Sequence, residues 1–154
     1  MPSAALDLRG VQTNKHLGQG PGDAPLMHID VLAVSKALSA AGYTRQSCVG
    51  YEFGGTLCAQ AKRSGAPIER MVIVSPRMAV SGQSVVLALG SGNGEHILIM
   101  MGDKDPVSNR IANRLDESLL GIRYEVVDSR ARGKDLLISE PRPVSYTHLT
   151  LPTM

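Results

Sequence analysis

Short, continuously apolar runs alternate with helix-like stretches along this chain, and this alternation constrains the fold more than any other feature. The clearest run is His96–Met101, and Met71–Pro76 is a second one of the same kind. Apolar runs without interleaved polar residues are typical of parallel strands that are buried on both faces. We therefore expect an α/β fold, a three-layer αβα sandwich with a mostly parallel sheet.

The other expected elements follow from hydrophobic periodicity and from glycine or proline at their ends. The expected strands are Ser3–Leu8, Gln46–Val49, Met71–Pro76, His96–Met101 and Tyr124–Val127. The expected helices are Leu26–Ala41, Gly54–Arg63 and Asn109–Leu120, with a weaker helical pattern within Met78–Leu89. The glycine-rich segment Gly90–Gly94 is expected to be flexible.

The composition narrows the kinds of partner. A length of 154 residues suits one ordinary domain, and 43% hydrophobic residues are enough for a core. The net charge is only +2, so no strong field of one sign is available to hold a phosphate backbone or an anionic membrane. Aromatic residues make up 3% of the chain, which leaves few rings to stack on bases. We expect neither nucleic acid nor a membrane as a partner.

Cys48 and Cys58 are the two cysteines of the chain, and we expect both to be buried, reduced thiols. Two cysteines cannot build a disulfide framework, and their spacing without nearby histidines matches no common zinc site. Reduced thiols are compatible with a cytoplasmic protein, although the sequence leaves the compartment and the oligomeric state open. We expect no metal, because Asp103 and Asp105 have no third ligand at a useful spacing, and no cofactor.

The most specific motif is Gly50-Tyr51-Glu52-Phe53-Gly54-Gly55, between an expected strand and an expected helix. It resembles the nucleophile elbow G-x-S-x-G of the α/β-hydrolase superfamily, in which glycines flank a residue in a strained strand-to-helix turn. The glycines are kept, and Glu52 stands where the nucleophile would be. In this resemblance the backbone N–H of Phe53 is the oxyanion-type donor.

Other segments resemble the same superfamily, in particular its small lidless esterases and dienelactone-hydrolase-like members. Asp7–Gly10 resembles the D-x-R-G that follows an earlier strand, and Ile68–Pro76 is similar to the strand after the elbow helix. Gly102–Val107 resembles the acid-bearing loop, which implies that Asp105 is the acid. Ala131–Leu137 resembles the histidine loop, with Arg132 where histidine is usual.

The resemblance implies a truncated domain. Three strands normally precede the D-x-R-G strand, which here begins almost at Met1, and a final helix is missing from the far end. Val144–Met154 resembles a translated sequencing-library adapter. We therefore expect residues 1–143 to be a partial α/β-hydrolase-like domain, lacking its first strands and last helix, and residues 144–154 to be a non-native tail.

The triad-equivalent positions are Glu52, Asp105 and Arg132, and they lack the groups for serine-hydrolase chemistry. Attack by a carboxylate on an ester would give an anhydride, and arginine cannot deprotonate to act as a base. The four histidines are expected away from the site, at positions 16, 28, 96 and 148. We expect these three positions to be non-catalytic.

The same three side chains are expected to lie close together, because the carboxyl ends of parallel strands meet at one edge of the sheet. Our hypothesis is a cluster in which Arg132 bridges Glu52 and Asp105 by forked hydrogen bonds. The Glu52 carboxylate would then occupy the former oxyanion hole near the Phe53 amide. The alternative is that Arg132 and Glu52 are solvated surface charges.

Three functions stay open at this point. The first is a hydrolase-fold protein that has lost catalysis and serves as a binding or structural module, its pocket either filled by the ionic cluster or open to a small-molecule ligand. The second is an active esterase-like or epoxide-hydrolase-like enzyme that uses Glu52 together with residues from missing segments. The third is a gene fragment without a function of its own.

Overall fold

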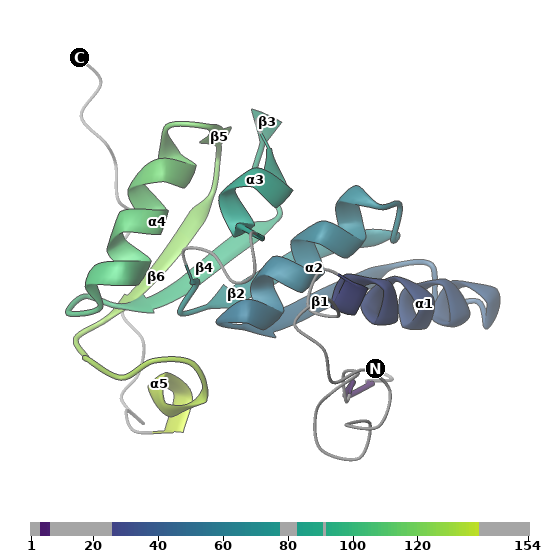
Figure 1. Ribbon diagram of the computed structural model, residues 1–154, viewed down its shortest axis with the longest axis horizontal. Helices are drawn as coiled ribbons and strands as arrows, with labels where there is room; N and C mark the ends of the chain where they lie inside the picture. Colours follow the sequence, from purple (N-terminus) through teal and green to yellow (C-terminus); the bar gives the residue numbers. More distant parts are fainter. Residues whose placement is uncertain (1–3, 7–25, 78–82, 91, 139–154) are drawn as a thin grey trace.

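A four-stranded, all-parallel sheet forms the centre of the protein (Figure 1). The computed structural model describes residues 4–6, 26–77, 83–90 and 92–138. The strands lie side by side in the order β1 (Gln46–Tyr51), β2 (Ile68–Val74), β4 (Ile97–Gly102) and β6 (Arg123–Val127). The predicted α/β class and the parallel sheet are confirmed.

Helices connect the strands and cover the sheet. They are α1 (Met27–Ala40), α2 (Phe53–Arg63), α3 (Val85–Leu89), α4 (Pro106–Asp116) and α5 (Lys134–Ile138). Figure 1 shows α2, α3 and α4 together on one side of the sheet, with the short α5 on the other side. Within the described residues, no helix is both long enough and apolar enough to cross a membrane.

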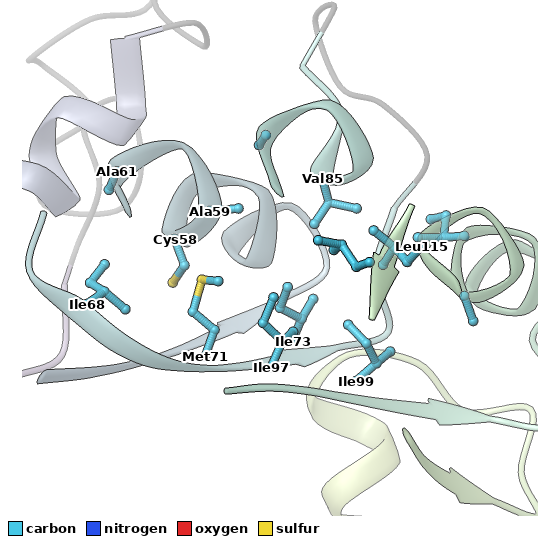
Figure 2. Packing of buried hydrophobic residues seen from close by; sticks show 14 of the residues in the cluster. Cys58, Ala59, Ala61, Ile68, Met71, Ile73, Val85, Ile97, Ile99 and Leu115 are labelled. Carbon is cyan, nitrogen blue, oxygen red and sulfur yellow. The ribbon is translucent and has the colours of Figure 1, made fainter. Parts of the chain in front are cut away.

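The core lies between the sheet and the helices α2, α3 and α4 (Figure 2). Ile73 of β2 and Ile99 of β4 are fully buried beneath these helices. The face that α2 turns to the sheet carries small side chains, which lets the helix approach the strands closely. Gly55 shows how close this approach is, because a Cβ atom there would lie 2.4 Å from Cγ2 of Ile73.

Two local predictions were wrong because short backbone pairings override composition. Gly92–Asn93 forms β3 and pairs in parallel with β5 (Leu119–Leu120), so part of the glycine-rich segment is a strand. Leu119–Leu120 was expected to end a helix, but α4 stops at Asp116 and the chain turns through Gly121, whose φ is +79°. The Gly94 N–H donates to the Leu120 carbonyl at 2.6 Å, and this hydrogen bond continues the pairing of β3 with β5.

The predicted first strand, Ser3–Leu8, is described only at residues 4–6. These three residues belong to no strand, and Leu6 is 40% exposed. The expectation of a buried strand is therefore wrong for these residues, since one large apolar side chain among alanines does not secure burial. Asp7–Gly10, His16 and the tail 144–154 lie outside the described residues.

The prediction of two reduced thiols was also wrong. Cys48 of β1 and Cys58 of α2 form a disulfide, with their Cα atoms 6.1 Å apart. The chain leaves β1, turns, and returns as α2 over the same strand, which brings together two residues that lie ten positions apart. Cysteine spacing alone does not reveal this return of the chain.

Candidate functional site

Glu52 stands at the turn between β1 and α2, in a conformation that side chains rarely adopt. Its φ is +48° and its ψ is −111°, and its N–H donates to the Val74 carbonyl at 2.7 Å. A Cβ at Gly50 would lie 2.4 Å from the backbone of Gly54, so glycine is required there. Gly54 has nothing within 4 Å of the corresponding position. The strand-turn-helix context predicted for Glu52 is therefore present, but Gly54 is not sterically required.

Asp105 begins α4 and is almost fully enclosed. Its Oδ1 accepts hydrogen bonds from the backbone N–H groups of Val107 and Ser108, at 3.1 and 3.3 Å, and its Oδ2 accepts from the Ser108 hydroxyl at 2.5 Å. The side chain of Asp105 is 1% exposed. These contacts make Asp105 an N-cap with Pro106 after it, a combination that favours the start of a helix.

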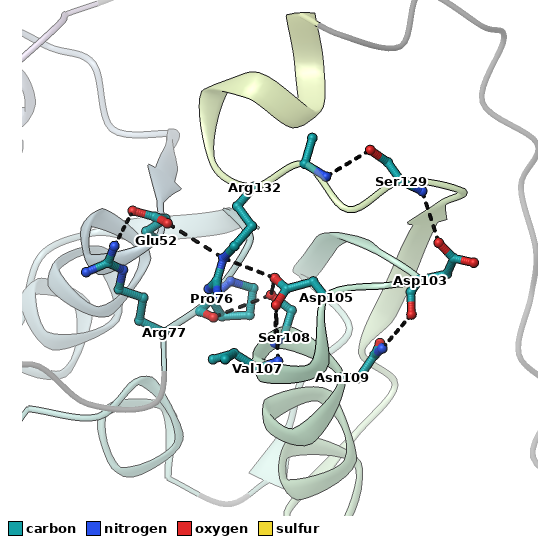
Figure 3. A network of polar contacts seen from close by, with 11 residues as sticks. Glu52, Pro76, Arg77, Asp103, Asp105, Val107, Ser108, Asn109, Ser129 and Arg132 are labelled. Carbon is teal, nitrogen blue, oxygen red and sulfur yellow. Dashed lines mark hydrogen bonds and ion pairs between the residues drawn. The ribbon is translucent and has the colours of Figure 1, made fainter.

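Arg132, from the loop after β6, lies between the two carboxylates (Figure 3). Its Nε is 3.3 Å from Asp105 Oδ2 and 3.7 Å from Glu52 Oε1. The predicted proximity of the three residues is thus confirmed, and the alternative of a solvated Arg132 is wrong. The forked hydrogen bonds are wrong too, because the same Nε faces both acids, and both Nε and Nη2 are buried without a hydrogen bond to any described residue, so the contacts of Nε are ion pairs only.

Arg77 is a member of the site that the sequence reasoning missed. Its Nη2 lies 3.0 Å from Glu52 Oε2, so Glu52 contacts two guanidinium groups (Figure 3). Arg77 follows β2, the strand next to β1, and its position at the carboxyl end of that strand could have indicated it.

The Glu52 carboxylate does not occupy the position that the sequence suggested. It makes no capping hydrogen bond to α2, so it does not use the Phe53 amide. Arg77 and Arg132 form ion pairs with it instead. The expected contact with the oxyanion-type donor is therefore wrong, because ionic contacts outweigh the helix N-terminus here.

The described histidines lie away from the cluster formed by Glu52, Arg77, Asp105 and Arg132. His96 directly precedes β4, at the end of the strand opposite to Asp105. His28 of α1 lines a separate cavity of about 260 Å³, next to Gln60 and Arg63 of α2. In the described part of the chain, no three potential ligands converge in a way that would hold a metal ion.

The cluster contains two acidic and two basic side chains, so their formal charges cancel. One member follows each strand of the sheet: Glu52 after β1, Arg77 after β2, Asp105 after β4 and Arg132 after β6. This arrangement ties together the carboxyl edge of the whole sheet.

Comparison with known proteins adds no assignment: no protein-family model, curated protein or solved structure matches the chain.

Proposed function

We propose that this chain is an α/β-hydrolase-like domain whose triad has been replaced by an ionic cluster, and that it serves as a non-catalytic binding or structural module. In this proposal the complete domain is a three-layer αβα sandwich, and the chain lacks the first strands and the last helix. The observation that carries the proposal is the position of Arg132 Nε, 3.3 Å from the buried Asp105. A triad histidine would hold this place, and arginine cannot exchange a proton there.

The surroundings of Glu52 support a loss of catalysis. Both of its carboxylate oxygens face guanidinium groups, from Arg77 at 3.0 Å and from Arg132 at 3.7 Å. Ion pairing with these cations makes the carboxylate a weaker nucleophile and a weaker base. No described histidine is near enough to activate water. The cluster therefore suits a structural link between strands better than acyl transfer.

The proposal can be tested by rebuilding the chemistry that we infer was lost. The double variant Glu52→Ser/Arg132→His places a hydroxyl at the elbow and an imidazole beside Asp105. We expect it to react covalently with a fluorophosphonate probe, measured by intact mass, whereas the unaltered protein gains no label. The matched control is Glu52→Ser/Arg132→Gln, which has the hydroxyl but no base.

Three outcomes decide the test. Labelling of the double variant at position 52, with none in the control, supports the hydrolase-like geometry. A folded double variant that stays unlabelled contradicts it. Turnover of chromogenic esters by the unaltered protein contradicts the loss of catalysis.

A second function is favoured by the exposure of Glu52. Its side chain is 30% exposed at the turn, so a reactive electrophile such as an epoxide can reach the carboxylate. Here a Glu52 oxygen would attack one epoxide carbon, the ring C–O bond would break, and the alkoxide would take a proton from water. A residue from a missing segment would activate the second water that hydrolyses the ester and frees Glu52. Epoxide turnover by the unaltered protein that is abolished in Glu52→Gln supports this function, and absence of turnover in both proteins excludes it for the substrates used.

A further inference from the structure

The disulfide Cys48–Cys58 encloses the entire elbow. Cys48 lies on β1 two residues before Gly50, and Cys58 lies on α2 after Gly55. The covalent loop therefore contains the strained residue Glu52, together with both glycines that the packing requires. No other part of the sheet edge described here is crosslinked in this way.

We propose that this disulfide is a redox-sensitive clamp that holds the elbow, and with it the Glu52 end of the ionic cluster. Glu52 has φ +48° and ψ −111°, a conformation that persists only where the surrounding structure enforces it. A covalent link between β1 and α2 restricts the alternative arrangements of the turn between them. This inference does not depend on whether the site is catalytic.

The two cysteine residues differ in how far they are buried. Cys58 is 3% exposed within the core, whereas Cys48 is half-buried on β1, which has β2 as its one neighbour in the described sheet. We therefore expect an incoming thiolate to attack Cys48, the less buried residue, rather than Cys58. In the proposed reaction Cys48 is therefore the cysteine that is attacked, and Cys58 is the leaving group.

A dithiol is the reductant that the proposal requires, and the reaction balances with it. One thiolate attacks Cys48 Sγ, the Cys48–Cys58 bond breaks, and Cys58 leaves as a thiolate that takes up a proton. The second thiol of the reductant then attacks the mixed disulfide and releases Cys48 as a thiol. Two electrons and two protons have passed to the protein, and the reductant has become a cyclic disulfide.

Reduction should loosen the elbow and leave the distant half of the sheet unchanged. The loop is short, with a sequence separation of 10, so we expect its opening to lower the melting temperature by about 5–10 °C. Cys58 and its neighbour Ala59 belong to the core, so α2 should stay folded. The change should be confined to the turn around Glu52 and the first turn of α2.

The experiment compares the oxidised and dithiothreitol-treated forms of the full chain without denaturant. Thiol counting should give no free thiol after equilibration with oxidised glutathione, and two after dithiothreitol. Hydrogen exchange measured by mass spectrometry should accelerate in peptides covering residues 50–59. Exchange in peptides covering β4 and α4 should change little.

The control is the double variant Cys48→Ala/Cys58→Ala, which has no sulfur to exchange. It should melt like the reduced protein and show no response to dithiothreitol. The proposal is overturned if the thiols stay free in oxidised glutathione, or if reduction requires denaturant. It is also overturned if exchange accelerates equally over the whole sheet, because the disulfide would then stabilise the molecule without acting on the elbow.

Discussion

Two helices begin at the same edge of the sheet, each next to an acidic residue, but their starts are built differently. The acid before α2, Glu52, makes no capping hydrogen bond and has a positive φ. The acid before α4, Asp105, has an extended backbone, accepts two N–H groups of the helix, and is 1% exposed. The start of α2 is therefore set by the backbone, and the start of α4 by a side chain.

This difference teaches which acid is free to change. Replacing Glu52 leaves the backbone turn in place, because Gly50 and Gly55 impose the close packing around it. Replacing Asp105 removes the groups that satisfy the first N–H donors of α4. The elbow can therefore exchange its side chain, whereas the acid loop cannot do so without loss of stability.

The largest expected effect comes from replacing Gly50, the elbow glycine that leaves no room for a side chain. Gly50→Ala would place a Cβ 2.4 Å from the Gly54 backbone, which cannot move without displacing α2. We expect a loss of about 3 kcal/mol or more in the free energy of unfolding, measured by urea denaturation. Gly54→Ala is the matched control and should gain about 0.5 kcal/mol, since it lies in the helix with open space around it. Equal effects of the two variants would refute the steric account.

The next largest effect is a difference in stability between the variants Asp105→Ala and Glu52→Ala. Asp105→Ala removes the cap and leaves Arg132 without its nearer carboxylate, so we expect a loss of about 2–3 kcal/mol. Glu52→Ala removes two partly exposed ion pairs and should cost about 1 kcal/mol or less. Both values come from chemical denaturation at neutral pH. If Glu52→Ala proved the more damaging variant, the comparison between the two helix starts would be wrong.

The smallest expected effect concerns a third acid, Glu125, which caps no helix and has no ion pair with a cation among the described residues. Glu125 of β6 is 5% exposed, and its Oε1 has no hydrogen-bond partner among the described residues. Burial raises the pKa of its carboxyl group above the ordinary value of 4.5, because the charged form loses hydration. The folded state therefore favours the protonated acid, so this contribution to stability is full below pH 4.5 and is lost as pH rises through the folded pKa.

Glu125→Gln removes this charge and tests the sign of that contribution. We expect the variant to melt about 2 °C above the unaltered protein at pH 8, with the gain disappearing near pH 4. Thermal melts across this pH range measure the difference. A variant that is less stable at pH 8 would indicate that the Glu125 carboxylate has a stabilising partner.

Much of the fold could be predicted because its signals are local. Continuous apolar runs such as Ile97–Met101 predict buried parallel strands, and the glycines around Glu52 predict a tight strand-to-helix turn. The meeting of Asp105 and Arg132 follows from topology, since both come after strands of one parallel sheet. These inferences need only the order of elements and the direction of the strands.

The remaining features depend on distances that periodicity does not contain. The disulfide of Cys48 and Cys58 requires α2 to return over β1, and cysteine spacing is silent on that geometry. The direction of the Glu52 carboxylate depends on a choice between the α2 amides and Arg77, which only the folded positions decide. The β3–β5 pair is two residues long on each strand and leaves no pattern in the sequence.

The close approach of Gly133 to Glu52 links two distant positions of the chain. Gly133 has a φ of +55°, and a Cβ there would lie 3.4 Å from Cγ of Glu52. A Cβ at that distance would be in ordinary van der Waals contact with Glu52, so the acid leaves room for it; the positive φ is what strains any other residue at 133. Glycine at 133 is therefore expected wherever this loop keeps its course, whether position 52 carries a long or a short side chain.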